Sequence, residues 1–136
     1  MSSPEAARIP ILAALKPKDR ENLLASAKKR TWAPGEIVVR QGDSALHLFL
    51  IEAGRANVQY ADGAVVATLG PGDFFGELGL IAEHVRTATV VAAETLTCIL
   101  LPSWEFRSLL DEHPEIAVPM LKTLIARMHG MSPHEH

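Results

Sequence analysis

The sequence has one cysteine, no long apolar run and no excess of positive charge, and each shortage excludes a class of protein. Cys98 stands alone, so it cannot form an internal disulfide, and nothing requires an oxidising compartment. No segment approaches the ~20 apolar residues that span a bilayer, and the first residues lack the apolar core of a signal peptide. These absences predict a cytoplasmic protein that does not cross a membrane.

Positive charge is also scarce. The chain carries 13 lysines and arginines against 16 aspartates and glutamates, which gives a formal net charge of -3. Binding to nucleic-acid phosphates needs lysines and arginines gathered on one face, and the one basic run is Lys28-Lys29-Arg30. We interpret this run as the exposed end of a helix, where cations are favourable, and we expect no nucleic-acid partner.

A length of 136 residues suits one hydrophobic core, so residues 1–136 are expected to form a single domain. Residues 4–30 and residues 103–130 have the composition of helices, whereas residues 31–101 are divided by glycines into short apolar runs. These runs are EIVVR, LHLFLIE, RANVQY, AVVATL, TATVVA and TLTCILL. Short strands separated by turns indicate an α+β fold built on an antiparallel β-roll or jelly roll.

Prolines and polar residues mark the expected helices. The run KDRENLLASAKKR after Pro17 predicts a helix that continues to Arg30. Ser103 is the expected N-cap of the following helix. In the last helix, Pro119 predicts a kink or a later start, because proline removes a backbone donor. The stripe that this helix is expected to bury consists of Ala117, Leu121, Leu124 and Met128.

The stretch FFGELGLIAEHVRTAT, residues 74–89, places Glu77 and Arg86 in mostly apolar surroundings. Burying either charge is costly unless a partner compensates it. One explanation is a structural ion pair that fixes a loop to the sheet, as many ion pairs do with little net stabilisation. The other is a ligand that both side chains bind. Spacing alone leaves both explanations open.

The wider pattern favours a ligand. In order and spacing, APGEIVVRQGD, LHLFLIEAGRANV and LGPGDFFGELGLI resemble the cyclic nucleotide-binding domain family, over roughly residues 10–130. Residues 74–89 resemble its phosphate-binding cassette, which has FGEL, a short helix and then Arg-Thr-Ala-Thr. The resemblance implies a short phosphate-binding helix and a sensor domain similar to that of catabolite activator proteins, without the DNA-binding domain.

The resemblance assigns a role to each site residue. Gly76, Glu77 and Leu78 would open the short helix, whose unpaired amides favour an anion such as a cyclic phosphate, and Gly76 would allow close backbone approach. Arg86 would bind two phosphate oxygens through paired hydrogen bonds. Glu77 would accept a hydrogen bond from the ribose 2'-hydroxyl.

Thr87 and Ala88 complete the predicted site by offering backbone amides to the phosphate, and Ala88 should be small for the same close approach. Threonine after the arginine accompanies cGMP in eukaryotic relatives and cAMP in bacterial ones. The expected ligand is therefore cAMP or cGMP, with cAMP favoured. A β-branched residue that begins a strand explains Thr87 equally well without any ligand.

The resulting hypothesis is a stand-alone cyclic nucleotide sensor that acts through an unknown protein partner or as a homodimer. A ligand-free interaction module with the same fold is one alternative. A cupin-like metal enzyme is the other, but only His134 and His136 have the His-x-His spacing and they lie in the tail. No Gly-x-Ser-x-Gly occurs. We expect no bound metal and no catalytic residue.

Overall fold

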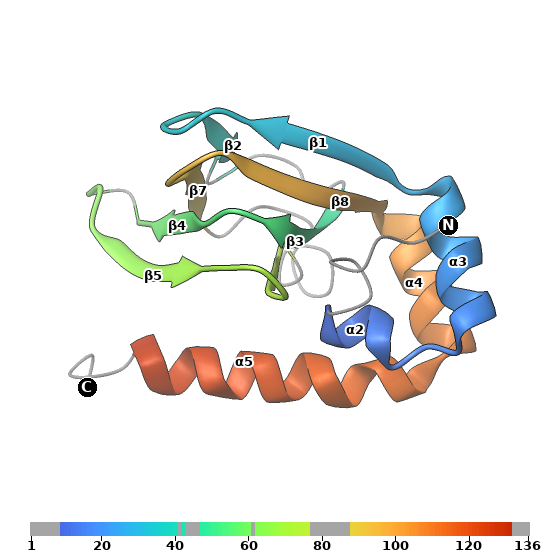
Figure 1. Cartoon of the computed structure of the whole chain (residues 1–136). Coiled ribbons are helices and arrows are strands. Elements are labelled where there is room, and N and C mark those ends of the chain that lie inside the picture. Colours follow the sequence, from blue (N-terminus) through green and yellow to red (C-terminus); the bar gives the residue numbers. More distant parts are fainter. Residues whose placement is uncertain (1–8, 41, 43–46, 61, 77–87, 132–136) are drawn as a thin grey trace.

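The computed structural model describes residues 9–40, 42, 47–60, 62–76 and 88–131, the last five by backbone alone. Eight strands form two four-stranded antiparallel sheets, with helices at both ends of the described chain (Figure 1). The predicted α+β fold with an antiparallel β-roll is confirmed. In chain order the elements are α2 Pro10–Ala13, α3 Pro17–Ser26, β1 Lys28–Trp32, β2 Ile37–Val39, β3 His47–Ala53, β4 Ala56–Gln59, β5 Val65–Leu69, β6 Phe74–Phe75, β7 Thr89–Ala92, β8 Leu96–Pro102, α4 Ser103–Glu112, the 3-10 helix η2 Pro114–Ile116, and α5 Ala117–Met131.

The first sheet, with strand order β1-β8-β3-β6, is the middle layer of the protein. Along β3, Leu48 and Leu50 point into a core shared with the helices, which we call the helix-side core. Phe49 and Ile51 point the opposite way, into the inter-sheet core. Successive strand residues face opposite sides of a sheet, so burial of both faces explains why LHLFLI and LTCILL are almost continuously apolar.

The second sheet, with strand order β2-β7-β4-β5, closes the inter-sheet core from the other side. Val90 and Ala92 of β7 are buried in that core, while Thr89 and Val91 between them are only half-buried. This alternation is typical of an antiparallel sheet that packs on one face and is partly open on the other.

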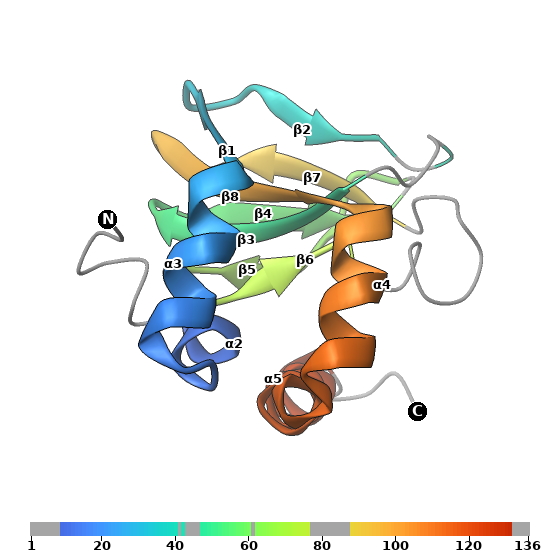
Figure 2. The same cartoon turned by 90° about the vertical axis from the view of Figure 1, so that its right-hand side faces the viewer.

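The helices cover the outer face of the first sheet, and Figure 2 shows α3 and α4 beside each other with α5 across their ends. Ile11 and Leu12 of α2 meet Ile116 and Met120 of η2 and α5 in the helix-side core. None of the helices in the described ranges combines the length and the apolar content that crossing a membrane requires.

Two expectations for the N-terminal helix were wrong. The helix ends at Ser26 and not at Arg30, and the run Lys28-Lys29-Arg30 lies in β1, an edge strand that pairs with β8. The strand buries only Trp32, and Lys29 Nζ reaches Glu52 Oε2 at 2.9 Å across the sheet. Charged edge strands discourage pairing with other chains, so these cations fit the edge better than a helix terminus.

The last helices also differ from expectation. Ser103 is the first residue of α4 and makes no capping side-chain hydrogen bond. Pro119 is the third residue of α5, where no intrahelical donor is required, so the helix continues to Met131. The buried face of this region passes through Ile116, Met120 and partly Leu124. Leu121 of the predicted stripe is 57% exposed, and Met128 lies beyond the described side chains.

Gly54 and Gly63 provide a matched test of the packing. Both have positive φ, 90° and 84°. A Cβ on Gly54 would overlap the Thr95 carbonyl oxygen, whereas a Cβ on Gly63 would meet nothing within 4 Å. Gly63→Ala should cost only the backbone strain of ~1–2 kcal/mol. Gly54→Ala should cost a further ~1–3 kcal/mol, measured by urea unfolding. Equal losses would show that the β3–β4 turn does not pack against the β7–β8 turn.

Candidate functional site

The predicted site begins in one sheet and ends in the other. β6 belongs to the first sheet, where Phe74 pairs with Leu50 and Phe75 pairs with Phe49. β7 belongs to the second sheet, where it lies between β2 and β4. The segment between these strands therefore connects the two layers of the β-roll, and its ends are fixed by different parts of the fold.

The entry strand β6 is held on both of its faces. Phe74 is 1% exposed and packs in the helix-side core, while Phe75 is 3% exposed and lies in the inter-sheet core. The Phe75 ring stacks on Phe49 with a centroid distance of 4.7 Å and an interplanar angle of 4°. A two-residue strand has few backbone hydrogen bonds, so these rings supply most of what positions it.

A tight turn leads into β6. The Asp73 amide donates to the Gly70 carbonyl at 3.0 Å, and the Gly70 amide donates to the Asp73 carboxylate at 2.9 Å. Pro71 and Gly72 occupy the central positions, where a φ of 94° at Gly72 suits a type II turn. The Ile51 amide donates to the Asp73 carbonyl at 2.8 Å, which ties the turn to β3.

Two of the six predicted site residues lie in the described part of the chain. Gly76 follows β6 directly, is half-buried and has a φ of 93°, a conformation that disfavours residues with a Cβ. Ala88 is half-buried and directly precedes β7. The other four, Glu77, Leu78, Arg86 and Thr87, lie outside the described residues, as do the predicted short helix and any pairing of Glu77 with Arg86.

The exit strand β7 is anchored by a turn at Ala33-Pro34-Gly35. The Gly35 amide donates to the Ala92 carbonyl at 2.7 Å, and the Ala92 amide donates to the Glu36 carbonyl at 2.9 Å. The turn itself closes through the Glu36 amide and the Ala33 carbonyl at 3.1 Å. After β2, Gly42 also has a positive φ, 95°, while its neighbours 41 and 43 lie outside the described residues.

Two observations on the described side chains concern metal ligands and the cysteine. Within the described ranges, no three histidine, cysteine, aspartate or glutamate side chains gather closely enough to hold a metal ion. Cys98 is buried in the inter-sheet core, and burial raises the pKa of its thiol to about 12. The thiolate is the reactive form of cysteine, so Cys98 is a core residue and not a nucleophile. His134 and His136 lie outside the described residues.

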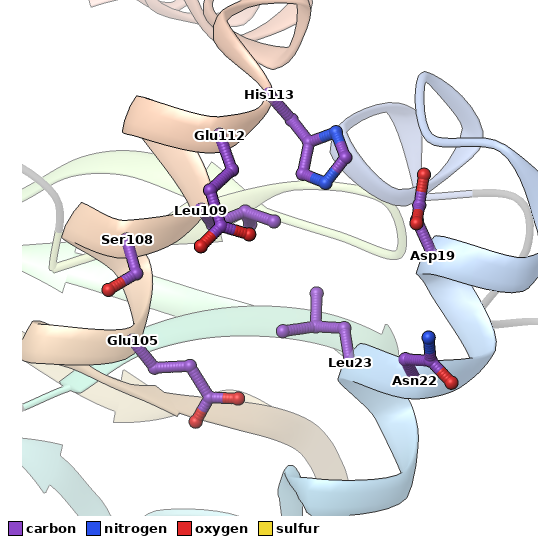
Figure 3. Close-up of a pocket in the computed structure, with 8 residues that line it drawn as sticks. All are labelled: Asp19, Asn22, Leu23, Glu105, Ser108, Leu109, Glu112 and His113. Atoms are coloured by element: carbon purple, nitrogen blue, oxygen red, sulfur yellow. The ribbon is translucent and has the colours of Figure 1, made fainter.

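The sequence did not predict a groove that the structure shows between α3 and α4. Eight residues of these helices and their ends line it (Figure 3), and none of them belongs to residues 74–89. Its lining is spread over two segments that are distant in the sequence, so no local motif indicates it.

Comparisons with known proteins agree with the fold and with the motif. A family model described as a cyclic nucleotide-binding domain matches residues 29–113. The chain is 40% identical over 102 residues to a cAMP-dependent protein kinase regulatory subunit of Schizosaccharomyces pombe, with 75% of this chain and 25% of that protein covered. Across the first curated relatives, the chain spans only 25% to 33% of their length.

Two solved structures are similar over most of the chain. The first is described as Sp-2Cl-cAMPS bound to PKAR CBD2, at 25% identity and a TM-score of 0.76, with 93% of this chain and 86% of that chain covered. The second is the regulatory subunit of a cAMP-independent protein kinase A from Trypanosoma brucei, at 27% identity and a TM-score of 0.77, with 88% and 43% covered. A mutant of that subunit, whose three substitutions include threonine to arginine, is bound to cAMP.

Cys98 provides a direct measure of how closed the inter-sheet core is. At about pH 8, which is below the raised pKa of Cys98, the thiol should react with a thiol reagent far more slowly in the native protein than in urea. The reason is that both access of the reagent and formation of the thiolate require the core to open. The rate should follow the free energy of unfolding in a destabilised variant such as Gly54→Ala. Fast labelling of the native protein, equal to that in urea, would contradict the burial of this thiol.

Proposed function

Because the chain belongs to the cyclic nucleotide-binding domain family, we propose that it binds a cyclic nucleotide through residues 76–88 and acts as a regulatory module. The observation that carries this proposal is the FGEL and Arg-Thr-Ala pattern placed between two rigidly held strands, β6 and β7. We also propose that residues 1–136 form one domain, since the helices at both ends share the helix-side core.

The two residues at the ends of the site, Gly76 and Ala88, are small, which suits an anionic ligand that contacts the backbone. Gly76 follows β6 with a positive φ, and a residue without a Cβ allows a ligand to approach the backbone closely. On the proposal, the amides that follow Gly76, with the Leu78 segment, favour the negative cyclic phosphate. At the other end, Thr87 and Ala88 add amides, and the small Ala88 side chain leaves room at the start of β7.

Arg86 has the central role in the proposal. A guanidinium can donate two parallel hydrogen bonds to phosphate oxygens, whereas an ammonium cannot reproduce that geometry. The Trypanosoma brucei comparison supports this choice, because a cAMP-independent relative is bound to cAMP in a mutant that gains an arginine. This chain has an arginine at the position that the motif assigns to phosphate binding.

Glu77 is proposed to distinguish ribonucleotides from 2'-deoxyribonucleotides. Its carboxylate is proposed to accept a hydrogen bond from the ribose 2'-hydroxyl, and a site built for such a bond rejects ligands that lack the hydroxyl. Among the purines we favour cAMP over cGMP, because a regulatory subunit named for cAMP is 40% identical to this chain. We further propose that the output passes through a protein partner or a dimer, with no catalytic step in this domain.

The alternative is a ligand-free module of the same fold, and the cAMP-independent relative favours it as a second candidate. The two candidates differ in what Glu77 and Arg86 do. In the ligand-free module they form a structural ion pair, and in the proposed sensor they bind phosphate and ribose. Substitution of each residue, with stability measured in the presence and absence of nucleotide, separates the two.

Nucleotide binding is tested by thermal unfolding and by titration with cAMP, cGMP and their 2'-deoxy forms. A ligand that binds only the native state adds ~2.7 kcal/mol at a hundred times its Kd, so the Tm should rise with cAMP. Arg86→Lys should weaken binding roughly ten- to a hundredfold, because a hydrogen bond to a charged group contributes ~1.5–3 kcal/mol. Glu77→Gln should narrow the difference between ribose and deoxyribose ligands.

Arg55→Lys is the matched control, because Arg55 is exposed in the β3–β4 turn of the described fold and lies outside residues 76–88. It should leave nucleotide binding unchanged. The proposal fails if wild type shows no Tm shift with either nucleotide and Arg86→Lys lowers the Tm without ligand. That combination would identify Glu77 and Arg86 as a structural ion pair.

A further inference from the structure

The groove between α3 and α4 has a volume of about 250 Å³ and combines an apolar floor with acidic walls. Leu23 of α3 and Leu109 of α4, both less than a tenth exposed, form the floor. Figure 3 shows Leu23 and the Glu105 carboxylate reaching into the space between the two helices. The remaining lining residues are Asp19, Asn22, Ser108, Glu112 and His113.

The carboxylates of this groove lack cationic partners. Asp19 and Glu112 make no ion pair or side-chain hydrogen bond within the described residues, and Glu105 accepts a hydrogen bond from the Ser26 hydroxyl at 2.8 Å. None of the described residues that line the groove is a lysine or arginine. His113 is directed to Glu115, with Nδ1 at 3.3 Å from Oε2. Asp19 and Glu105 lie in the first turns of α3 and α4, where the helix dipole offsets part of their charge. Within the described ranges, no lysine or arginine side chain lines the groove with these two carboxylates and Glu112.

A single metal ion does not suit this arrangement. In the part of the chain that the structure describes, no three carboxylate or imidazole groups converge as a metal site requires, although three carboxylates line the groove. The charges are instead spread along the two helix walls. An occupant with cationic groups on an apolar stem, such as a lysine or arginine side chain, matches both the spread of charge and the leucine floor.

An exposed aromatic residue of α4 lies one helical turn from the groove wall, although it does not line the groove itself. Trp104 is 68% exposed, although tryptophan is among the residues most often buried in interfaces. Residues four apart lie on one face of a helix, so Trp104 is next to Ser108 of the groove wall. Tryptophan rings attract guanidinium and ammonium groups. The aromatic ring and the acidic groove thus favour the same kind of partner.

We propose that the groove between α3 and α4 is a docking surface for a basic segment of another protein. A lysine or arginine of that segment lies over Leu23 and Leu109 with its charge among Asp19, Glu105 and Glu112, and a neighbouring basic residue packs on Trp104. The charge complementarity selects a basic partner over an acidic or apolar one. None of the residues that line the groove belongs to residues 76–88, so the proposal does not depend on nucleotide binding.

A fluorescein-labelled hexapeptide of arginine, lysine and leucine tests the proposal by anisotropy with the full chain. Asp19→Asn with Glu112→Gln removes two groove charges while keeping the side-chain shapes. Because exposed ion pairs contribute modestly, loss of two of them in the double variant should weaken binding about tenfold. Glu21→Gln with Asp111→Asn is the control, because both residues are exposed on α3 and α4 but do not line the groove.

The control pair changes the net charge equally and should leave the affinity within about twofold. Trp104 supplies a second measurement, because Trp32 is buried and only Trp104 is exposed to a bound peptide. Peptide binding should shift the emission of wild type, and Trp104→Phe should abolish that shift and weaken binding. Unchanged circular dichroism and Tm show that the variants remain folded.

Three outcomes overturn the proposal. Equal weakening by the control pair means that the peptide responds to net charge and not to the groove. Absence of binding at low salt, where exposed charges interact most strongly, means that the groove takes no basic peptide. Spermine that binds with the same dependence on Asp19 and Glu112, and as tightly as the peptide, identifies a small polyamine site in place of a protein docking surface.

Discussion

Burial of the first sheet on both faces is the constraint on which the rest of the structure depends. Leu50 and Phe49 are neighbours on β3, yet they belong to different cores, so the same strand supports the helices and the second sheet. Full burial of such a side chain contributes ~1.5–3 kcal/mol. Polar groups have no open face on which to lie in the centre of this sheet, so binding chemistry must lie elsewhere in the fold.

The position of the proposed nucleotide site follows from this arrangement. Residues 74–89 leave the doubly buried sheet at Phe75 and enter the second sheet at Thr89. Their ends are fixed by ring stacking and by hydrogen bonds to the Ala33–Glu36 turn. A ligand proposed to bind at both Gly76 and Ala88 contacts the chain where it leaves one sheet and where it joins the other. Ligand binding would thus favour one position of the first sheet relative to the second.

The sequence predicted the elements whose pattern is local. The six short apolar runs located β2, β3, β4, β5, β7 and β8, because each run places at least one side chain in a core. It did not predict β1, because Lys28, Lys29 and Arg30 suit a helix end by charge and only Trp32 of that strand is buried. The exposure of Leu121 was also missed, since the start of α5 at Ala117 and the burial of Ile116 set the face that packs. The site residues came from a motif, and of the two that the structure describes, Gly76 has a positive φ that favours glycine.

Charge distribution matters more than net charge in a domain of this size. The net charge of -3 argued against a broad basic face. In the described part of the chain, positive charge gathers on the short strand β1, whereas carboxylates without a cationic partner gather between α3 and α4. Exposed charges separated by more than ~8 Å are largely screened at physiological salt. Each surface therefore attracts partners through its own local charges. The α3–α4 groove favours a cation, whereas Arg86 of the same chain is proposed to bind an anion. The net charge of the sequence does not reveal that the two charged surfaces are separate. Their separation depends on the packing of α3 against α4, in which Leu23 and Leu109 are buried.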